Sequence, residues 1–327
     1  MNTANRVVIT RLLPGEPESR LRAACGERVG HVFRNEIDVP LERGALLDAV
    51  RGASAVVATP ADRIDAAFFE AAGEPLRIVS VYAVGVDNVD LVEAARRGVR
   101  VGHTPDAVTE PTADIAWLLL LGAARRATEG AHLVRRADWA GLGVHVLLGR
   151  RLVGKTLLIV GAGRIGMAVA RRALGWQMRV RYVARSHHPE FEAEPIRAQR
   201  VELAAGLREA DFVSLHTPLT AETHHLIGEP EFAQMRPDAV LVNTARGPVV
   251  DEAALVAALR AQRIAAAGLD VYEHEPRLQD GLAELDNAFL LPHLGSATVD
   301  DRLWMMEMAI DNVAAVLRGE PPPHAVV

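Results

Sequence analysis

The stretch LLIVGAGRIG, at positions 157–166, decides the fold of this chain. An apolar run of strand character meets three glycines spaced GxGxxG, and the helix-forming stretch MAVARRAL follows at 167–174. In a Rossmann βαβ unit the first glycine allows a tight turn, the second lets the backbone approach a pyrophosphate, and the third lets helix and strand pack closely. We therefore predict a dinucleotide site at the helix N-terminus, formed by Gly161, Gly163, Arg164, Ile165 and Gly166.

The end of the next predicted strand, residues 180–183, should recognise the ribose of the cofactor. An acidic residue there would hold the 2′-hydroxyl of NAD, but the chain reads Ala184-Arg185-Ser186. Arg185 offers a planar fork of donors to a 2′-phosphate, and Ser186 offers a hydroxyl. These residues favour NADP(H), while NAD(H) stays open because a neutral residue at 184 admits either. The alternative is that Arg185 only points into water.

Composition limits the class of protein. With 327 residues, 50% hydrophobic residues and a formal net charge of −6, the chain is expected to be a soluble protein of two domains. Mild acidity argues against nucleic acid or an anionic membrane as a partner. Cys25 is the only cysteine, so we expect no internal disulfide, a small buried apolar role for this residue, and a cytoplasmic location. The apolar stretches are too short to span a bilayer.

Short β-branched runs alternate with alanine-rich helical stretches along the whole chain. This alternation predicts the α/β class with two doubly wound parallel-sheet domains. The predicted strands outside the glycine motif are 6–10, 55–59, 77–81, 99–101, 180–183, 212–216, 240–243, 265–269 and 288–291. Helices are expected over about 112–125 and 298–319. A proline follows a strand near 103–105, and the chain is expected to cross back to the first domain near 292–295. We therefore predict one domain of residues 1–103 and 296–327 and a cofactor domain of residues 104–295.

Seven motifs in order give the chain a family resemblance. They are YAVGVDNVD (82–90), TPDAVTEPTAD (104–114), GAGRIG (161–166), SLHTPLTAET (214–223), VNTARGPVVDE (242–252), GLDVYEHEP (268–276) and LPHLGSAT (291–298). Over nearly its full length the chain resembles the D-isomer-specific 2-hydroxyacid dehydrogenases, and most of all the glyoxylate and hydroxypyruvate reductases. The resemblance implies a Rossmann nucleotide-binding domain, a flavodoxin-like substrate domain and an active site in the cleft between them.

The same resemblance implies three catalytic residues. Arg246 would bind the carboxylate of a 2-oxo acid and polarise its carbonyl group. His293 would protonate the ketone oxygen as general acid, and Glu275 would hydrogen-bond this histidine and favour its imidazolium form. A structural salt bridge is the alternative for Arg246. Glu273, two residues before Glu275, is expected to face solvent, and His216 is expected to be structural.

Further binding residues follow from the matched motifs. Backbone N–H groups of Val84 and Gly85 would form an anion-binding nest for the substrate carboxylate. Trp139 resembles an aromatic residue that reaches the active site of a neighbouring subunit, with simple packing as the alternative. The remaining cofactor contacts would be Thr217, Pro218, Thr244, Ala245, Asp270 and Gly295, which follow strand ends, where ligands of open α/β sheets bind. Asp270 would lie near the nicotinamide and the catalytic histidine.

The resemblance thus implies an oxidoreductase that reduces glyoxylate or hydroxypyruvate to the 2-hydroxy acid with NAD(P)H. A homodimer is expected, its contacts formed by the helix over 112–125 and by residues 139–150. No metal is expected, since no histidines, cysteines or carboxylates show ligand spacing along the chain. Two alternatives stay open. One is another D-2-hydroxyacid dehydrogenase, such as a 2-ketogluconate-type reductase, and the other is a corepressor-like protein that senses nicotinamide cofactors.

Overall fold

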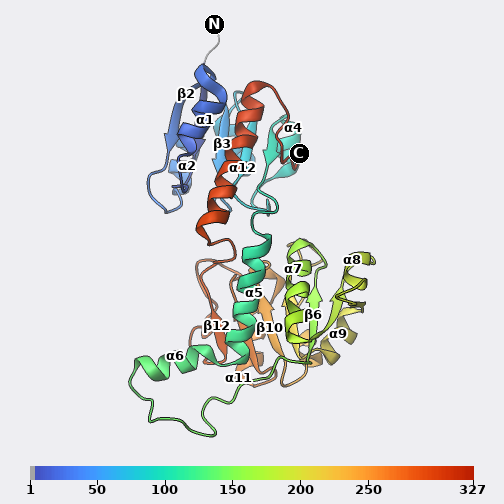
Figure 1. Ribbon diagram of the computed structural model, residues 1–327. Coiled ribbons are helices and arrows are strands. Elements are labelled where there is room, and N and C mark those ends of the chain that lie inside the picture. The colour runs from blue at the N-terminus through green and yellow to red at the C-terminus, as the bar shows by residue number, and fades with distance from the viewer. Residues whose placement is uncertain (1–3) are drawn as a thin grey trace. The chain divides into compact units, whose positions relative to one another are not determined.

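The computed structural model describes residues 4–327, which fall into two compact units (Figure 1). The first unit contains residues up to Val108 together with Ala297–Val327, and the second is Thr109–Ser296. The chain therefore leaves the first unit at the start of a helix and returns to it just before another. The first limit lies a few residues beyond the predicted boundary near the proline at 103–105. The second lies just beyond the predicted crossing near 292–295.

The first unit is built on a five-stranded parallel sheet with strand order β2-β1-β3-β4-β5. Its strands are β1 (Asn5–Ile9), β2 (Val29–Arg34), β3 (Ala55–Ala58), β4 (Ile78–Val81) and β5 (Arg100–Gly102). This is the flavodoxin-like order, so the predicted fold class is confirmed for this unit. The sequence missed β2, an edge strand whose VGHVFR sequence leaves most side chains partly accessible.

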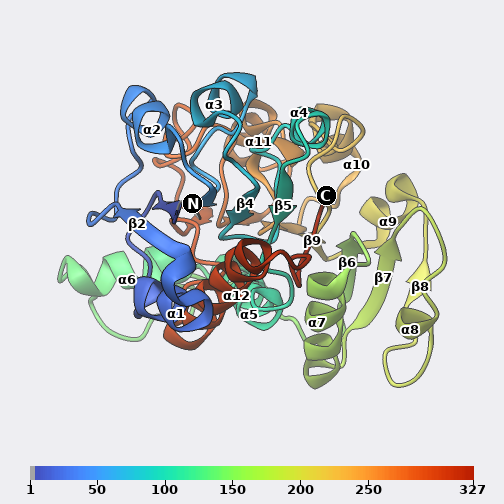
Figure 2. The same cartoon turned by 90° about the horizontal axis from the view of Figure 1, so that it is seen from above.

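Helices cover both faces of this sheet (Figure 2). One face carries α2 (Arg43–Val50), α3 (Ala66–Ala72) and α4 (Leu91–Arg96), and the other carries α1 (Pro17–Cys25) and α12 (Val299–Arg318). Successive side chains of β1 point to opposite faces of the sheet. Val8 therefore packs with the first set of helices, while Val7 and Ile9 pack with the second. Cys25 is buried in the second layer, as predicted.

Helix α12 begins and ends where the sequence predicted. The Thr298 hydroxyl accepts the Asp301 N–H at 3.0 Å, which caps the first turn. Gly319 ends the helix with φ +89°, a left-handed conformation that suits glycine. None of the helices in residues 4–327 is both long and apolar enough to cross a membrane.

The second unit is built on a seven-stranded parallel sheet with strand order β12-β11-β10-β9-β6-β7-β8. Its strands are β6 (Thr156–Val160), β7 (Arg179–Val183), β8 (Gln199–Arg200), β9 (Phe212–Leu215), β10 (Val240–Asn243), β11 (Ala266–Leu269) and β12 (Ala288–Leu290). The order reverses between β6 and β9. In doubly wound sheets ligands bind beyond the carboxyl ends of the strands at such a switch point, so the topology places the glycine motif there.

The faces of this sheet are also covered by helices. On one face lie α5 (Thr109–Ala124) and α7 (Arg164–Ala173), and on the other α9 (Leu203–Glu209), α10 (Glu229–Gln234) and α11 (Glu252–Arg260). Two further helices of this unit are α6 (Ala127–Arg135) and α8 (Pro189–Glu192), and its short 3₁₀ turns are Leu174–Trp176 and Gly247–Val249. A similar turn in the first unit is Gly26–Arg28. Helix α6 and residues 136–150 extend away from the sheet of this unit (Figure 1).

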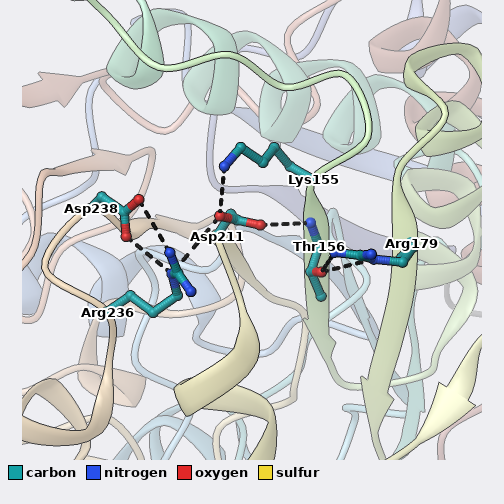
Figure 3. Close-up of polar contacts among 6 residues, drawn as sticks. All are labelled: Lys155, Thr156, Arg179, Asp211, Arg236 and Asp238. Atoms are coloured by element: carbon teal, nitrogen blue, oxygen red, sulfur yellow. Dashed lines mark hydrogen bonds and ion pairs between the residues drawn. The ribbon is translucent and has the colours of Figure 1, made fainter.

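A polar network ties the amino ends of the central strands (Figure 3). One Asp211 carboxylate oxygen accepts the Thr156 N–H at 2.9 Å, and the other pairs with Lys155 Nζ at 3.2 Å. Arg179 donates to the Thr156 hydroxyl, and Arg236 lies between Asp211 and Asp238. Because Thr156 begins β6 and the glycine motif follows its end, this network stabilises the edge opposite the predicted cofactor site.

Candidate active site

The three glycines after β6 each meet a different spatial demand. Gly161 has φ +105°, and a Cβ there would lie 2.7 Å from the His216 carbonyl carbon and 2.8 Å from Thr217 N. A Cβ on Gly166 would collide with the Gly161 carbonyl oxygen. A Cβ on Gly163, at the N-cap of α7, would meet no atom within 4 Å. The first and third glycines are therefore required by the protein itself, while the second borders open space.

Two hydroxyl groups at the same edge of the sheet are buried and have no hydrogen-bond partner. They are Thr217 Oγ1, after β9, and Thr244 Oγ1, after β10. Buried polar groups are nearly always hydrogen-bonded, and each exception calls for an explanation. A polar ligand at the carboxyl ends of β6, β9 and β10 would satisfy both. Together with the open side of Gly163, these residues fit a bound dinucleotide.

The turn after β7 is held by a residue that the sequence reading missed. Arg200 Nε donates to the Ala184 carbonyl oxygen at 2.9 Å, and its Nη2 donates to that of Arg185 at 3.2 Å. Arg185 and Ser186 are exposed and follow directly after the strand. Arg200 gave no signal because its strand, β8, is only two residues long and was not predicted.

The turn that carries Arg246 is shaped by its neighbours. Asn243, the last residue of β10, accepts the Ala245 N–H at 3.0 Å and donates Nδ2 to the Arg246 carbonyl at 2.9 Å. Arg246 Nη1 donates to the Ala245 carbonyl at 2.7 Å. A Cβ on Gly247 would overlap the Tyr272 carbonyl group, so glycine is required here. These contacts press the Arg246 turn against the segment that leads to Glu275.

His293 and Glu275 form a direct pair. His293 Nδ1 lies 2.8 Å from Glu275 Oε2, and Glu275 Oε1 accepts the Tyr272 N–H at 2.9 Å. The backbone amide thus fixes the carboxylate, and the carboxylate fixes the imidazole ring. The His293 side chain is 48% exposed, so its other nitrogen can reach a ligand.

The pKa of Glu275 reports the same arrangement. Burial by itself would raise this pKa, but the hydrogen bond from His293 and the positive charges of His293 and Arg246 outweigh burial. The pKa of Glu275 therefore lies below its usual value, and the carboxylate stays charged. Arg246, Glu275 and His293, predicted from three separate motifs, act on one another electrostatically.

Asp270 anchors the turn that contains His293. Its carboxylate accepts the N–H groups of Leu294 at 2.7 Å and Gly295 at 2.8 Å. His293 has φ +55°, an unusual conformation for a non-glycine residue, and these two bonds hold the residues that follow it. Burial raises the pKa of Asp270, which is 1% exposed. Thr112 Oγ1 adds a bond to the Gly295 carbonyl at 3.0 Å.

The other predicted residues belong to several segments. Val84 and Gly85 follow β4 in the first unit, where His103 Nδ1 donates to the Val84 carbonyl at 2.9 Å. Trp139 is 58% exposed on the extended segment after α6. Pro218 is exposed and Ala245 is buried. Their roles as substrate or cofactor contacts stay predictions.

One expectation needs correction. Glu273 does not face solvent: its side chain is 16% exposed, pairs with His225 Nε2 at 2.8 Å and accepts the Glu252 N–H at 3.3 Å. Although no metal-type ligands are spaced for a site along the sequence, folding brings His224, His225 and Glu273 together. The loop after β9 and the segment after β11 meet only in three dimensions, although the adjacent histidines were a signal.

His216 has the structural surroundings that were expected of it. Its Nε2 lies 2.8 Å from Ser214 Oγ, while Nδ1 is buried without a partner. Burial lowers the pKa of His216 to about 3, so the ring is neutral at physiological pH.

Comparison with known proteins supplies the family. Residues 117–295 match the model described as D-isomer specific 2-hydroxyacid dehydrogenase, NAD binding domain. A glyoxylate reductase of Thermococcus litoralis is 48% identical over 288 residues, covering 87% of this chain and 86% of its own length. One from Thermococcus gammatolerans is 46% identical over 325 residues, covering 98% and 95%.

A solved structure agrees with these sequence matches. The NADPH-dependent glyoxylate/hydroxypyruvate reductase of Sinorhizobium meliloti, in complex with NADP and malonate, is 30% identical with a TM-score of 0.85. The match covers 99% of this chain and 97% of that one. The glycine loop, the paired parallel sheets and these matches agree, and the chain belongs to the D-isomer-specific 2-hydroxyacid dehydrogenase family, with a nicotinamide cofactor-binding domain.

Proposed function

We propose that this protein reduces glyoxylate and hydroxypyruvate to their 2-hydroxy acids with NADPH. The observation that carries the proposal is the 2.8 Å pair between His293 and Glu275, with Arg246 close enough to lower the pKa of Glu275. A proton donor and a carboxylate-binding cation are what the reduction of a 2-oxo acid requires from the protein. The names of the relatives from Thermococcus and Sinorhizobium support this substrate class.

In this proposal Arg246 binds the substrate. Its guanidinium offers paired donors to the carboxylate and draws electron density from the neighbouring carbonyl group. The Asn243 contacts and the required Gly247 hold its backbone in place. We also propose that the backbone N–H groups of Val84 and Gly85 bind the substrate carboxylate, which makes the first unit the substrate domain and the second the cofactor domain.

His293 supplies the proton. The Glu275 carboxylate accepts from Nδ1, which leaves Nε2 as the donor to the ketone oxygen. When bound, a reduced nicotinamide would supply the hydride for the 2-oxo carbon. The His293 imidazolium would give its proton to the ketone oxygen, which forms the alcohol and leaves the ring neutral. Asp270 positions this histidine through the backbone that follows it and lies at the nicotinamide end of the site. No step in this scheme asks for a metal ion.

The cofactor would lie along the carboxyl ends of β6, β7, β9 and β10. Gly161, Gly163, Arg164, Ile165 and Gly166 would hold the pyrophosphate, with Thr217, Pro218, Thr244, Ala245 and Gly295 along the riboses and nicotinamide. NADPH is favoured because Arg185 and Ser186 follow β7 and Arg200 holds the carbonyl groups of Ala184 and Arg185 in the same turn. Arg185→Ala should weaken NADPH more than NADH, and equal weakening of both would contradict the preference.

We further propose a cytoplasmic homodimer. Leu142 and Val144 are 99% and 84% exposed on the segment after α6. Trp139 on the same segment and Val134 in the last turn of α6 are also exposed. Apolar side chains gathered on a protruding segment are typical of a protein interface. Sedimentation of the protein and of a Leu142→Asp variant tests this proposal: the variant should shift toward monomer, and an unchanged dimer would place the interface elsewhere.

A steady-state assay tests the activity. Purified protein is mixed with glyoxylate or hydroxypyruvate and with NADPH or NADH, and Arg246→Ala and His293→Ala are measured beside it. We expect turnover that favours NADPH and is lost in both variants. If larger 2-oxo acids such as 2-ketogluconate turn over faster, the proposal of glyoxylate and hydroxypyruvate as the substrates is wrong. If NADPH binds tightly with no turnover of any 2-oxo acid, the protein is a cofactor-dependent binding protein instead.

A further inference from the structure

Two histidines and a carboxylate meet on the second unit, beside the Arg246 turn. His224 and His225 lie in the loop after β9, and Glu273 follows β11. One possible ligand atom from each of these side chains lies within 4.8 Å of the other two. In the part of the chain that the structure describes, no other group of this kind occurs. We propose that this cluster, His224–His225–Glu273, binds a divalent transition-metal ion of the zinc type.

The donor atoms fit such an ion. Two imidazole nitrogens and one carboxylate oxygen form a ligand set that zinc prefers, with a fourth position left for water. His225 Nε2 already lies 2.8 Å from Glu273 Oε1, and the ring centroids of His224 and His225 are 4.0 Å apart. Hard ions such as Mg²⁺ and Ca²⁺ favour oxygen ligands throughout. The cluster should therefore discriminate strongly between the two classes of ion.

Only a small movement separates the cluster from tetrahedral geometry. Bonds of about 2.0–2.2 Å would hold the ligand atoms about 3.3–3.6 Å apart. His224 is exposed, so its side chain can move toward the other two without disturbing the core. The ion would take the place of the hydrogen bond between His225 and Glu273.

The carboxylate ligand is already oriented by a second layer of contacts. Glu273 Oε2 accepts the Glu252 N–H at 3.3 Å, and the Glu273 N–H donates to Glu252 Oε1 at 2.8 Å. Glu252 is 2% exposed at the start of α11. Outer hydrogen bonds of this kind fix metal-ligating carboxylates and are a regular part of metal sites. Glu273 is therefore held in place before any ion binds.

A bound ion would join two segments of the second unit, the loop after β9 and the segment after β11. The His225 N–H donates to the Pro248 carbonyl at 2.8 Å, just after the Arg246 turn. Gly247 packs against the backbone of Tyr272 and Glu273, two residues before Glu275. The ion would thus tie the segment that carries Glu275 to a loop that is already bonded to the Arg246 turn. Since it binds only the folded chain, it should raise the melting temperature.

Isothermal titration of the full chain with Zn²⁺, using protein without a histidine tag and treated first with a chelator, tests the proposal. The variants are His224→Ala, which removes an exposed ligand, and Glu273→Gln, which keeps an oxygen for the Glu252 N–H. His187→Ala is the matched control, because His187 also pairs with a carboxylate, that of Glu192 at 2.6 Å, away from the cluster. Mg²⁺ replaces Zn²⁺ in a parallel titration.

We expect one Zn²⁺ per chain and at least tenfold weaker binding in His224→Ala and in Glu273→Gln. The affinity of His187→Ala should equal that of the parent. The fold of each variant without the ion should be unchanged. Mg²⁺ should not bind. Absorption of bound Co²⁺ in the visible range should report tetrahedral coordination in the parent and be lost in His224→Ala. Absence of Zn²⁺ binding by the parent, or equal affinity in His224→Ala and the parent, would overturn the proposal whatever the enzyme reduces.

Discussion

His293 Nδ1 lies 2.8 Å from Oε2 of Glu275, and the other oxygen of that carboxylate is bound to the Tyr272 amide. The ring and the carboxylate come from loops after different strands, yet one backbone N–H sets the orientation of both. A proton donor in a reductase must present one nitrogen to the substrate, and this chain of bonds fixes which nitrogen that is.

Glu275→Gln should lower kcat about a hundredfold, a typical loss when assisted proton transfer fails. The amide keeps the size of the side chain but lacks the charge that stabilises the imidazolium. The affinity for NADPH, measured by cofactor fluorescence, should not change. A variant with parental kcat would show that the pair is structural.

Arg246→Lys should not rescue the function of the arginine. Lysine keeps the positive charge but loses the planar pair of donors that matches a carboxylate. A charge-assisted hydrogen bond contributes about 1.5–3 kcal/mol, so kcat/KM for glyoxylate should fall about tenfold to a hundredfold. Steady-state kinetics with the lysine and alanine variants measure this, and a fully active lysine variant would exclude paired donation.

The two glycines of the cofactor loop should respond differently to alanine. Gly163→Ala meets open space, so the melting temperature without cofactor should stay close to that of the parent, while NADPH binding weakens at least tenfold. Gly161→Ala should lower the melting temperature, because its Cβ would press on the His216 and Thr217 backbone in a left-handed conformation. Thermal melts and cofactor titrations of both variants test this. Unchanged cofactor affinity in Gly163→Ala would place the phosphates elsewhere.

Asp270→Asn should destabilise the second unit. The Leu294 and Gly295 N–H groups bind different oxygens of the carboxylate, and in asparagine one of these two positions is an NH₂ donor that cannot accept. A buried unsatisfied group costs about 1–3 kcal/mol, and the free energy of unfolding in denaturant should fall by that amount. The rate of reduction should fall as well, since the backbone next to His293 is released. Parental stability in this variant would mean that solvent replaces the lost bond.

His216 should make stability depend on pH. Its pKa is about 3 in the folded chain because of burial, whereas an unfolded histidine titrates at about 6.5. Below about 6.5 the unfolded state gains a proton that the folded state does not, so this residue lowers the free energy of unfolding as pH falls toward 3. Urea melts of the parent and of His216→Gln should therefore converge as pH falls from 7 to 4.5. A constant difference between the two would contradict burial of the neutral ring.

The sequence alone determined much of this protein. Glycine spacing after an apolar strand predicted a tight turn with close helix packing, because a close approach of backbone to backbone tolerates no Cβ, and Gly161 and Gly166 show this approach in the structure. That the same loop binds the cofactor stays a prediction. Alternation of short strands and helices predicted both sheets, since a buried parallel strand reads as a continuous apolar run. The two ends of α12 could be predicted because capping depends on the residues at the ends themselves, here Thr298 and Gly319.

Tertiary structure alone decided the contacts between distant loops. The edge strands β2 and β8 were missed, because a half-exposed edge needs no apolar run. No spacing along the chain predicts that Arg200 holds the turn after β7, that Asp270 holds the turn at His293, or that Glu273 meets His225. The last two of these contacts join loops at the carboxyl ends of parallel strands, and the first joins a turn to the neighbouring strand. The order of strands in the sheet, not their order in the chain, makes such segments neighbours.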